Sequence, residues 1–209
     1  MAVGNIAAGR LYRSSSPIDP AQGDRRYVAD ALLKEAGVVT AVNTADCRLR
    51  FRNFEGYSAT YYAALGERNQ VALNMGHEYT SDAFLEDMYN GLEFITERAG
   101  PYLIHGTDGA ERTGYLCMVL EALMGASTEE ILADYLISYE DYYQMSPDSA
   151  EYRAARAQGI SNLLSFTGAA SERELNGLDL PQVTRTYLLE RVKLSEQQVD
   201  LLVAHLSAA

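Results

Sequence analysis

The chain has 209 residues, of which 47% are hydrophobic and 22% are charged, and its formal net charge is −12. This length suits one sizeable domain, or one domain with an appendage. The acidic balance argues against nucleic acids and anionic membrane surfaces as partners, because few cations are available to neutralise their phosphates. The sequence has no run of 18 apolar residues, so we expect no membrane span.

Two cysteines, Cys47 and Cys117, are expected to be reduced thiols. Their spacing suits neither a disulfide framework nor a metal site, and we expect no metal and no cofactor. Residues 1–5 lack the basic and apolar regions of a signal peptide. We therefore expect either a cytoplasmic protein or the trimmed form of an exported one, and the sequence leaves localisation and oligomeric state open.

The first half of the chain alternates between strand and helix patterns. Strands are predicted at residues 10–14, 38–43, 71–75 and 101–104, and helices at residues 27–36, 54–65, 84–98 and 115–124. Strands that alternate with helices favour an α/β fold, with a mainly parallel central sheet flanked by helices. Ligands of such sheets bind beyond the carboxyl ends of the strands.

The second half of the chain is predicted to be helical. Helices are expected from Ser127 onward and at residues 150–157, 182–192 and 195–206, with breaks at Gly159, Gly168, Gly177 and Pro181. We therefore predict an α/β core over residues 1–126 and a helical extension over residues 127–209. The extension is expected to pack on the core, so that the two form one structural domain.

The most distinctive segment is residues 105–114, His-Gly-Thr-Asp-Gly-Ala-Glu-Arg-Thr-Gly, between an apolar strand and an apolar helix. A glycine-rich turn of this kind directs consecutive backbone N–H groups at one point, and the helix N-terminus adds partial positive charge. Arg112 supplies a planar fork that matches two phosphate oxygens. The residues predicted to bind phosphate are Thr107, Asp108, Gly109, Ala110, Glu111 and Arg112.

This segment resembles the signature of the cysteine-dependent protein tyrosine phosphatases, His-Cys-x5-Arg-Ser/Thr. The residues in register with it are His105, Gly109, Arg112, Thr113 and Gly114. Gly106 stands where that family carries its nucleophilic cysteine. A Walker phosphate loop would instead need Gly-Lys-Ser/Thr at residues 111–113. Residues 11–17, 43–46 and 101–127 are similar to a bacterial branch of the tyrosine and dual-specificity phosphatases.

The resemblance implies a phosphatase fold and hydrolysis of phosphomonoesters, above all phosphotyrosine, through a phosphocysteine intermediate. Thr113 is then expected to hydrogen-bond at the nucleophile position, while His105 and Gly114 shape the loop. A chain with Gly106 cannot form the intermediate. It is therefore either an inactivated variant that still binds phosphate, which we favour, or a natural pseudophosphatase that binds phosphorylated ligands.

Two carboxylates remain as candidates for the general acid, the residue that would protonate the leaving group. Glu111 lies in the loop itself, and Asp82 lies upstream, where it is equally suited to capping a helix. The candidates for the rim of the site are Arg13, Asp46, His77 and Glu78. The carboxylates of Asp108 and Glu111 beside the loop favour a monophosphate over a polyphosphorylated ligand.

Overall fold

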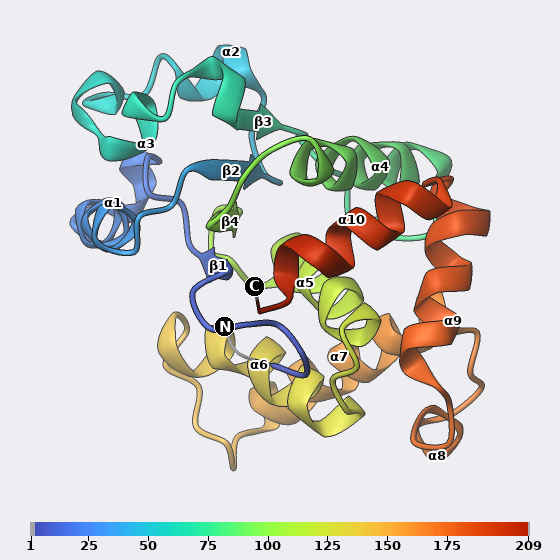
Figure 1. Ribbon diagram of the computed structural model, residues 1–209. Helices are drawn as coiled ribbons and strands as arrows, with labels where there is room; N and C mark the ends of the chain where they lie inside the picture. Colours follow the sequence, from blue (N-terminus) through green and yellow to red (C-terminus); the bar gives the residue numbers. More distant parts are fainter. Residues whose placement is uncertain (1–2, 209) are drawn as a thin grey trace.

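The structure is a computed structural model that describes residues 3–208. Residues 1 and 2, which belong to the predicted core and to the segment considered as a signal peptide, lie outside the described residues. Residue 209, the last of the predicted extension, also lies outside them. Its centre is a parallel four-stranded sheet with strand order β1-β4-β2-β3 (Figure 1). The strands are β1 (Leu11–Ser14), β2 (Thr40–Asn43), β3 (Gln70–Ala72) and β4 (Tyr102–His105). The sheet and its flanking helices confirm the predicted α/β fold.

The two central strands are buried along their whole length. All four residues of β2 and all four of β4 are inaccessible to solvent, and Tyr102 is in register with both Leu11 and Thr40. Strands covered on both faces are continuously apolar rather than alternating, which is why they were predictable. The third strand is shorter than predicted and ends at Ala72.

Short helices cover one face of the sheet. They are α1 (Arg25–Glu35), α2 (Arg48–Phe51) and α3 (Tyr61–Ala64), with 3-10 turns at Pro20–Gln22, Tyr57–Ala59 and Glu67–Asn69. The predicted helix at residues 54–65 is wrong. Gly56 is left-handed, with φ of 78°, and Thr60 is extended, with its hydroxyl accepting from Ala63 N, so the segment divides into a turn and a single helical turn.

The remaining helices form the other side of the molecule (Figure 1). They are α4 (Asp82–Thr96), α5 (Glu111–Leu123), α6 (Thr128–Asp141), α7 (Ala150–Thr167), α8 (Glu172–Leu175), α9 (Leu180–Tyr187) and α10 (Glu196–Leu206), with a π-helical turn at Leu188–Val192. Helix α5 is buried from Thr113 to Leu123. The main apolar core surrounds it and contains residues from before and after residue 126.

The predicted break at Gly159 is wrong, because α7 runs through this position. A Cβ on Gly159 would lie 2.9 Å from Leu132 Cδ2 and 3.0 Å from Tyr135 Cδ1. The glycine therefore allows α7 to approach α6 closely rather than ending the helix. Gly168 does end α7, in a left-handed conformation with φ of 74°.

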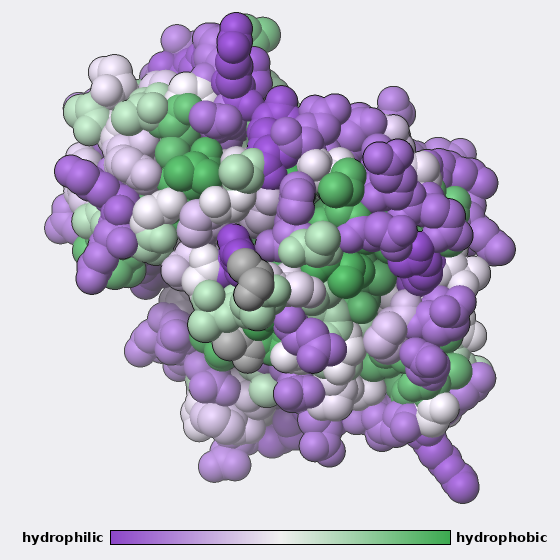
Figure 2. Space-filling view, in the orientation of Figure 1, coloured by the Kyte–Doolittle hydropathy of each residue, from purple (hydrophilic) through white to green (hydrophobic). Residues whose placement is uncertain are grey.

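The face of the molecule in Figure 2 is mostly hydrophilic, with apolar residues in separate patches. Across residues 3–208, no helix combines the length and apolar character needed to cross a membrane.

Candidate anion-binding site

The segment predicted to bind phosphate leaves the central strand β4 and enters α5 at the carboxyl edge of the sheet. Segments that follow the neighbouring strands are hydrogen-bonded to it. Ser16 N, after β1, donates to Thr107 O at 3.1 Å, and Thr44 N, after β2, donates to His105 O at 2.8 Å. The ends of three strands thus meet here, where parallel sheets place their ligands.

Arg112 is anchored to the segment that follows β3. Its Nη1 donates a 2.8 Å hydrogen bond to Met75 O. The buried carboxyl group of Asp46 lies within electrostatic range of Arg112; burial raises the pKa of this carboxyl, while its bond from Asn43 and the nearby arginines act in the opposite sense. The predicted rim residue Asp46 is therefore within the electrostatic influence of Arg112, while its ion pair, of 3.5 Å, is with Arg50.

Gly109 is required by the turn of the loop. Its φ is 77°, and a Cβ here would lie 2.5 Å from Ser14 O. Its carbonyl oxygen accepts hydrogen bonds from Arg13 Nη1 at 2.9 Å and from Ser138 Oγ at 3.1 Å. The loop is therefore held in place by β1 and α6 through the Gly109 carbonyl. Arg13, which was predicted for the rim of the site, instead hydrogen-bonds to the backbone of the loop.

The N-terminus of α5 has no side-chain cap. Its N-cap is Ala110, and α1 likewise lacks a side-chain cap, whereas serine hydroxyls cap α4, α6, α7 and α10. Ala110 N itself donates to Asp108 Oδ1 at 3.0 Å, so this one amide is engaged within the loop. The first N–H groups of α5, at Glu111 and Arg112, are of the kind that an anion satisfies.

Gly106 faces two buried hydroxyl groups. A Cβ here would lie 2.7 Å from Thr113 Oγ1 and 2.9 Å from Thr44 Oγ1. These two oxygens are 3.0 Å apart, and Thr44 Oγ1 donates to His105 O at 3.0 Å. Thr113 is then the donor between the hydroxyls. They occupy the space in which a side chain at position 106 would begin.

His105 is buried between the loop and α3. Its Nε2 is 3.1 Å from the Tyr62 hydroxyl, and the two rings meet edge to face. Burial lowers the pKa of His105 to about 3, so the ring is neutral at physiological pH. A neutral, hydrogen-bonded ring is suited to shaping the loop rather than to proton transfer.

The two candidate acids lie in different places. Glu111 Oε2 is 3.0 Å from His77 Nδ1 at the start of α5, so the structure brings these two candidates together, both about half exposed. Asp82 is the first residue of α4, but the cap of that helix is Ser81. Asp82 and Arg191 line the same cavity. None of the loop residues lines this cavity. Glu78 contributes its carbonyl oxygen to the turn before α4.

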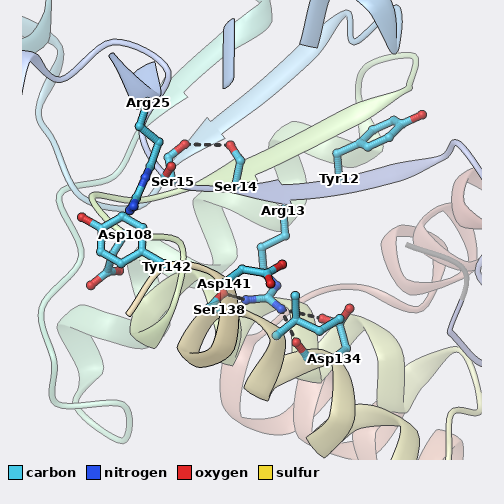
Figure 3. A pocket seen from close by; sticks show the side chains of 11 residues that line it. Tyr12, Arg13, Ser14, Ser15, Arg25, Asp108, Asp134, Ser138, Asp141 and Tyr142 are labelled. Carbon is cyan, nitrogen blue, oxygen red and sulfur yellow. Dashed lines mark hydrogen bonds and ion pairs between the residues drawn. The ribbon is translucent and has the colours of Figure 1, made fainter. Parts of the chain in front are cut away.

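A buried charged cluster lies behind the loop. Arg13 and Asp134 form an ion pair of 2.9 Å, and Figure 3 shows the guanidinium between Asp134 and Ser138. Glu121 is 1% exposed, and neither carboxylate oxygen has a hydrogen-bond partner within the described residues. Burial, reinforced by the charge of Asp134, raises the pKa of Glu121 well above its usual range.

Four residues near the loop were not predicted from the sequence: Thr44, Asp134, Ser138 and Glu121. Each is one polar position in a segment whose pattern indicates only a strand end or a buried helix, and only the folded arrangement brings it to the loop. Within residues 3–208, no three His, Cys, Asp or Glu side chains are grouped so that they could hold a metal ion.

The parallel sheet, its flanking helices and the loop entering α5 are consistent with the protein tyrosine phosphatase fold. The model of the tyrosine phosphatase family matches residues 51–208, and the chain belongs to this family. A search of curated proteins found no match. The family suggests a phosphatase that acts on phosphorylated substrates.

Proposed function

We propose that residues 106–112 of this chain bind the phosphate group of phosphotyrosine. The chain forms no covalent intermediate with this phosphate and does not hydrolyse it. The observation that supports this most strongly is the environment of Gly106. The position offers no nucleophile, and the hydroxyls of Thr44 and Thr113 stand where a side chain would begin. Membership of the tyrosine phosphatase family supports phosphate as the ligand.

The ligand is held by charge and by directed N–H groups. The uncapped N-terminus of α5 offers its first amides to a dianion, and the Arg112 guanidinium supplies a bidentate contact. The Thr113 hydroxyl hydrogen-bonds to Thr44 next to Gly106. The carboxylates of Asp108 and Glu111 disfavour additional phosphate groups, so a monophosphate is the preferred ligand.

In an active relative of this site, Glu111 is our candidate for the general acid. It belongs to the loop and is oriented by His77, whereas Asp82 lies in a separate cavity beside Arg191. The assignment concerns the phosphatase reaction, which a chain with Gly106 cannot start because no thiolate is available to attack phosphorus.

Two origins of Gly106 lead to different expectations. In an inactivated variant, restoring the thiol restores an otherwise intact active site. In a natural pseudophosphatase, which is the alternative function, the site serves only to bind phosphorylated ligands. The contacts of Gly106 refine the test, because a new Cβ needs both the Thr113 and the Thr44 hydroxyls to move, and Thr44→Ala relieves one of the two contacts.

The test is hydrolysis of para-nitrophenyl phosphate by the unaltered chain, Gly106→Cys, Gly106→Cys with Thr44→Ala, and Thr44→Ala alone as the control. Vanadate-sensitive turnover in either cysteine variant would establish the active-enzyme lineage. Inert cysteine variants, in a chain that still binds phosphotyrosine peptides, would favour the binding module. Turnover by the unaltered chain that is lost in Arg112→Ala would mean direct attack by water and would overturn the proposal.

A further inference from the structure

The end of α6 and the residues just after it are bonded to the loop at two successive positions. Ser138 Oγ, on the helix, donates to the Gly109 carbonyl oxygen at 3.1 Å. Beyond the helix, the Tyr143 hydroxyl donates to Asp108 Oδ2. The first contact supports the backbone of the loop, whereas the second reaches a carboxylate that belongs to the loop itself.

The Asp108 carboxylate accepts hydrogen bonds on both of its oxygens. Oδ1 accepts from Ala110 N at 3.0 Å, and Oδ2 accepts from the Tyr143 hydroxyl. Among the residues that the structure describes, no arginine, lysine or histidine forms an ion pair with this carboxylate. Neutral donors, rather than a cation, therefore offset its charge beside the amides at the start of α5.

Tyr143 is held in place by its neighbours. Its ring stacks on Tyr139, with centroids 5.7 Å apart and 26° between the planes, and it meets Tyr142 edge to face at 4.9 Å. The chain turns back directly after it, because Gln144 is left-handed, with φ of 56°, and Met145 N donates to Tyr139 O at 3.0 Å. A formed turn and a ring stack thus direct the hydroxyl at the loop.

The hydroxyl is the donor of this hydrogen bond at physiological pH. Burial, and then the bond to Asp108 and the charge of that carboxylate, raise the pKa of Tyr143 above its usual range. The charge of Glu111 acts in the same sense. Tyr143 therefore stays protonated and offers its O–H to the carboxylate, although the residue is 42% exposed.

A carboxylate beside a bound phosphate acts mainly against one ionic form of the ligand. A phosphate monoester loses its second proton at a pH of about 6, so it binds as a dianion at physiological pH and as a monoanion in mild acid. Repulsion between like charges at a partly buried site is stronger for the dianion. A hydroxyl that donates to the carboxylate reduces this repulsion.

We propose that Tyr143 is a positioning residue of the phosphate site, which enables the loop to accept phosphomonoesters as dianions by donating to Asp108. Tyr143 acts through the carboxylate and does not itself contact the phosphate. The proposal rests on the proposed function, because it requires a phosphate bound at residues 106–112. It adds the ionic form of the ligand and a residue outside the loop that selects this form.

The test is calorimetric titration of phenyl phosphate into the full chain at pH 7.5 and at pH 5. Tyr143→Phe removes the hydroxyl and keeps the stacked ring. Asp108→Asn removes the charge and keeps an oxygen for the bond from Ala110 N, and a double variant combines the two changes. Tyr152→Phe is the matched control, because its hydroxyl donates to another carboxylate, Glu140 Oε1 at 2.6 Å, at a cavity that no loop residue lines.

At pH 7.5 we expect Tyr143→Phe to weaken binding about fivefold, the size of electrostatic coupling at a partly exposed site, and at pH 5 by less than about twofold. In the Asp108→Asn background the same change should have no effect, because the charge that the hydroxyl offsets is absent. Tyr152→Phe should bind like the unaltered chain. Circular dichroism at both pH values verifies folding, and Asp108→Ser takes the place of Asp108→Asn if that variant is unfolded.

The outcomes separate the two proposals. If the unaltered chain does not bind phenyl phosphate at either pH, the proposed function is wrong and the role of Tyr143 falls with it. If the unaltered chain binds and Tyr143→Phe binds as tightly at pH 7.5, only the role of Tyr143 is overturned. An equal loss in the Asp108→Asn background, or an equal loss at both pH values, would mean that Tyr143 merely supports the loop, and would also overturn it.

Discussion

At the scale of single residues, the two glycines of the loop differ in physical role. Gly109 needs a left-handed backbone and lies against the main chain of Ser14, so both its conformation and its surroundings exclude a side chain. Gly106 has no left-handed conformation, and the atoms that a Cβ would meet belong to the side chains of Thr44 and Thr113. Position 106 is therefore the more adaptable of the two.

Replacing Gly109 by alanine is expected to destabilise the fold by about 1–3 kcal/mol from backbone strain alone, with the close approach to Ser14 O adding to it. Urea unfolding followed by circular dichroism measures the change. Gly168→Ala is the control, because Gly168 also has a left-handed φ, of 74°, but no atom within 4 Å of its added Cβ. If both variants lose the same stability, the packing against β1 contributes nothing.

His105 makes stability depend on pH in the acid range. Its pKa falls from 6.5 in the unfolded chain to about 3 in the fold, so below pH 6.5 the unfolded state binds the extra proton. The free energy of unfolding should therefore fall by about 2 kcal/mol between pH 6.5 and 5 from this residue alone. We expect His105→Gln to lack this component in urea titrations, and an unchanged pH profile in the variant would refute the assignment.

At the scale of elements, β1, α5 and α6 are joined by the buried cluster of Arg13, Asp134 and Glu121. One cation faces two carboxyl groups, and Cys117 on α5 lies within electrostatic range of all three. The Arg13–Asp134 pair satisfies one charge. Burial, and then the neighbouring Asp134, raise the pKa of Glu121 well above its usual range and so favour its protonated form.

Glu121→Gln is expected to stabilise the protein increasingly as pH rises. The folded pKa of Glu121 lies well above 4.5, so the folded state retains a proton that the unfolded state has lost. Stability is thereby lost with rising pH, at up to about 1.4 kcal/mol per pH unit. Unfolding midpoints measured at pH 5, 6.5 and 8 should show a widening gap in favour of the variant. A constant gap would indicate that Glu121 is ionised in the fold.

Elements were predictable where the local pattern decides their structure. The apolar runs of β2, β4 and α5 indicate buried elements before any tertiary information is used, and the loop between β4 and α5 has its signals within ten residues. The helix expected at residues 54–65 failed because Gly56 and Thr60 override an aromatic pattern. Glu121 and Asp134 could not be identified from the sequence as members of a buried charged cluster, because the cluster forms only when the fold brings them together with Arg13.

At the scale of the whole molecule, the proposed site concentrates positive potential in a chain of net charge −12. Binding of an anion to the fold alone stabilises it by RT ln(1 + [L]/Kd). Inorganic phosphate at about 100 times its Kd should therefore add about 2.7 kcal/mol to the free energy of unfolding. Arg112→Ala should remove this gain, while Arg173→Ala, an exposed change on α8, should retain it.

The measurement that tests the central claim most directly is a calorimetric titration of phosphotyrosine into the unaltered chain, with released phosphate assayed in the same sample. We predict saturable binding at one site, no release of phosphate, and loss of binding in Arg112→Ala. Release of phosphate that depends on Arg112, or binding that survives its replacement, would contradict the account of residues 106–112 as a phosphate-binding loop without a nucleophile.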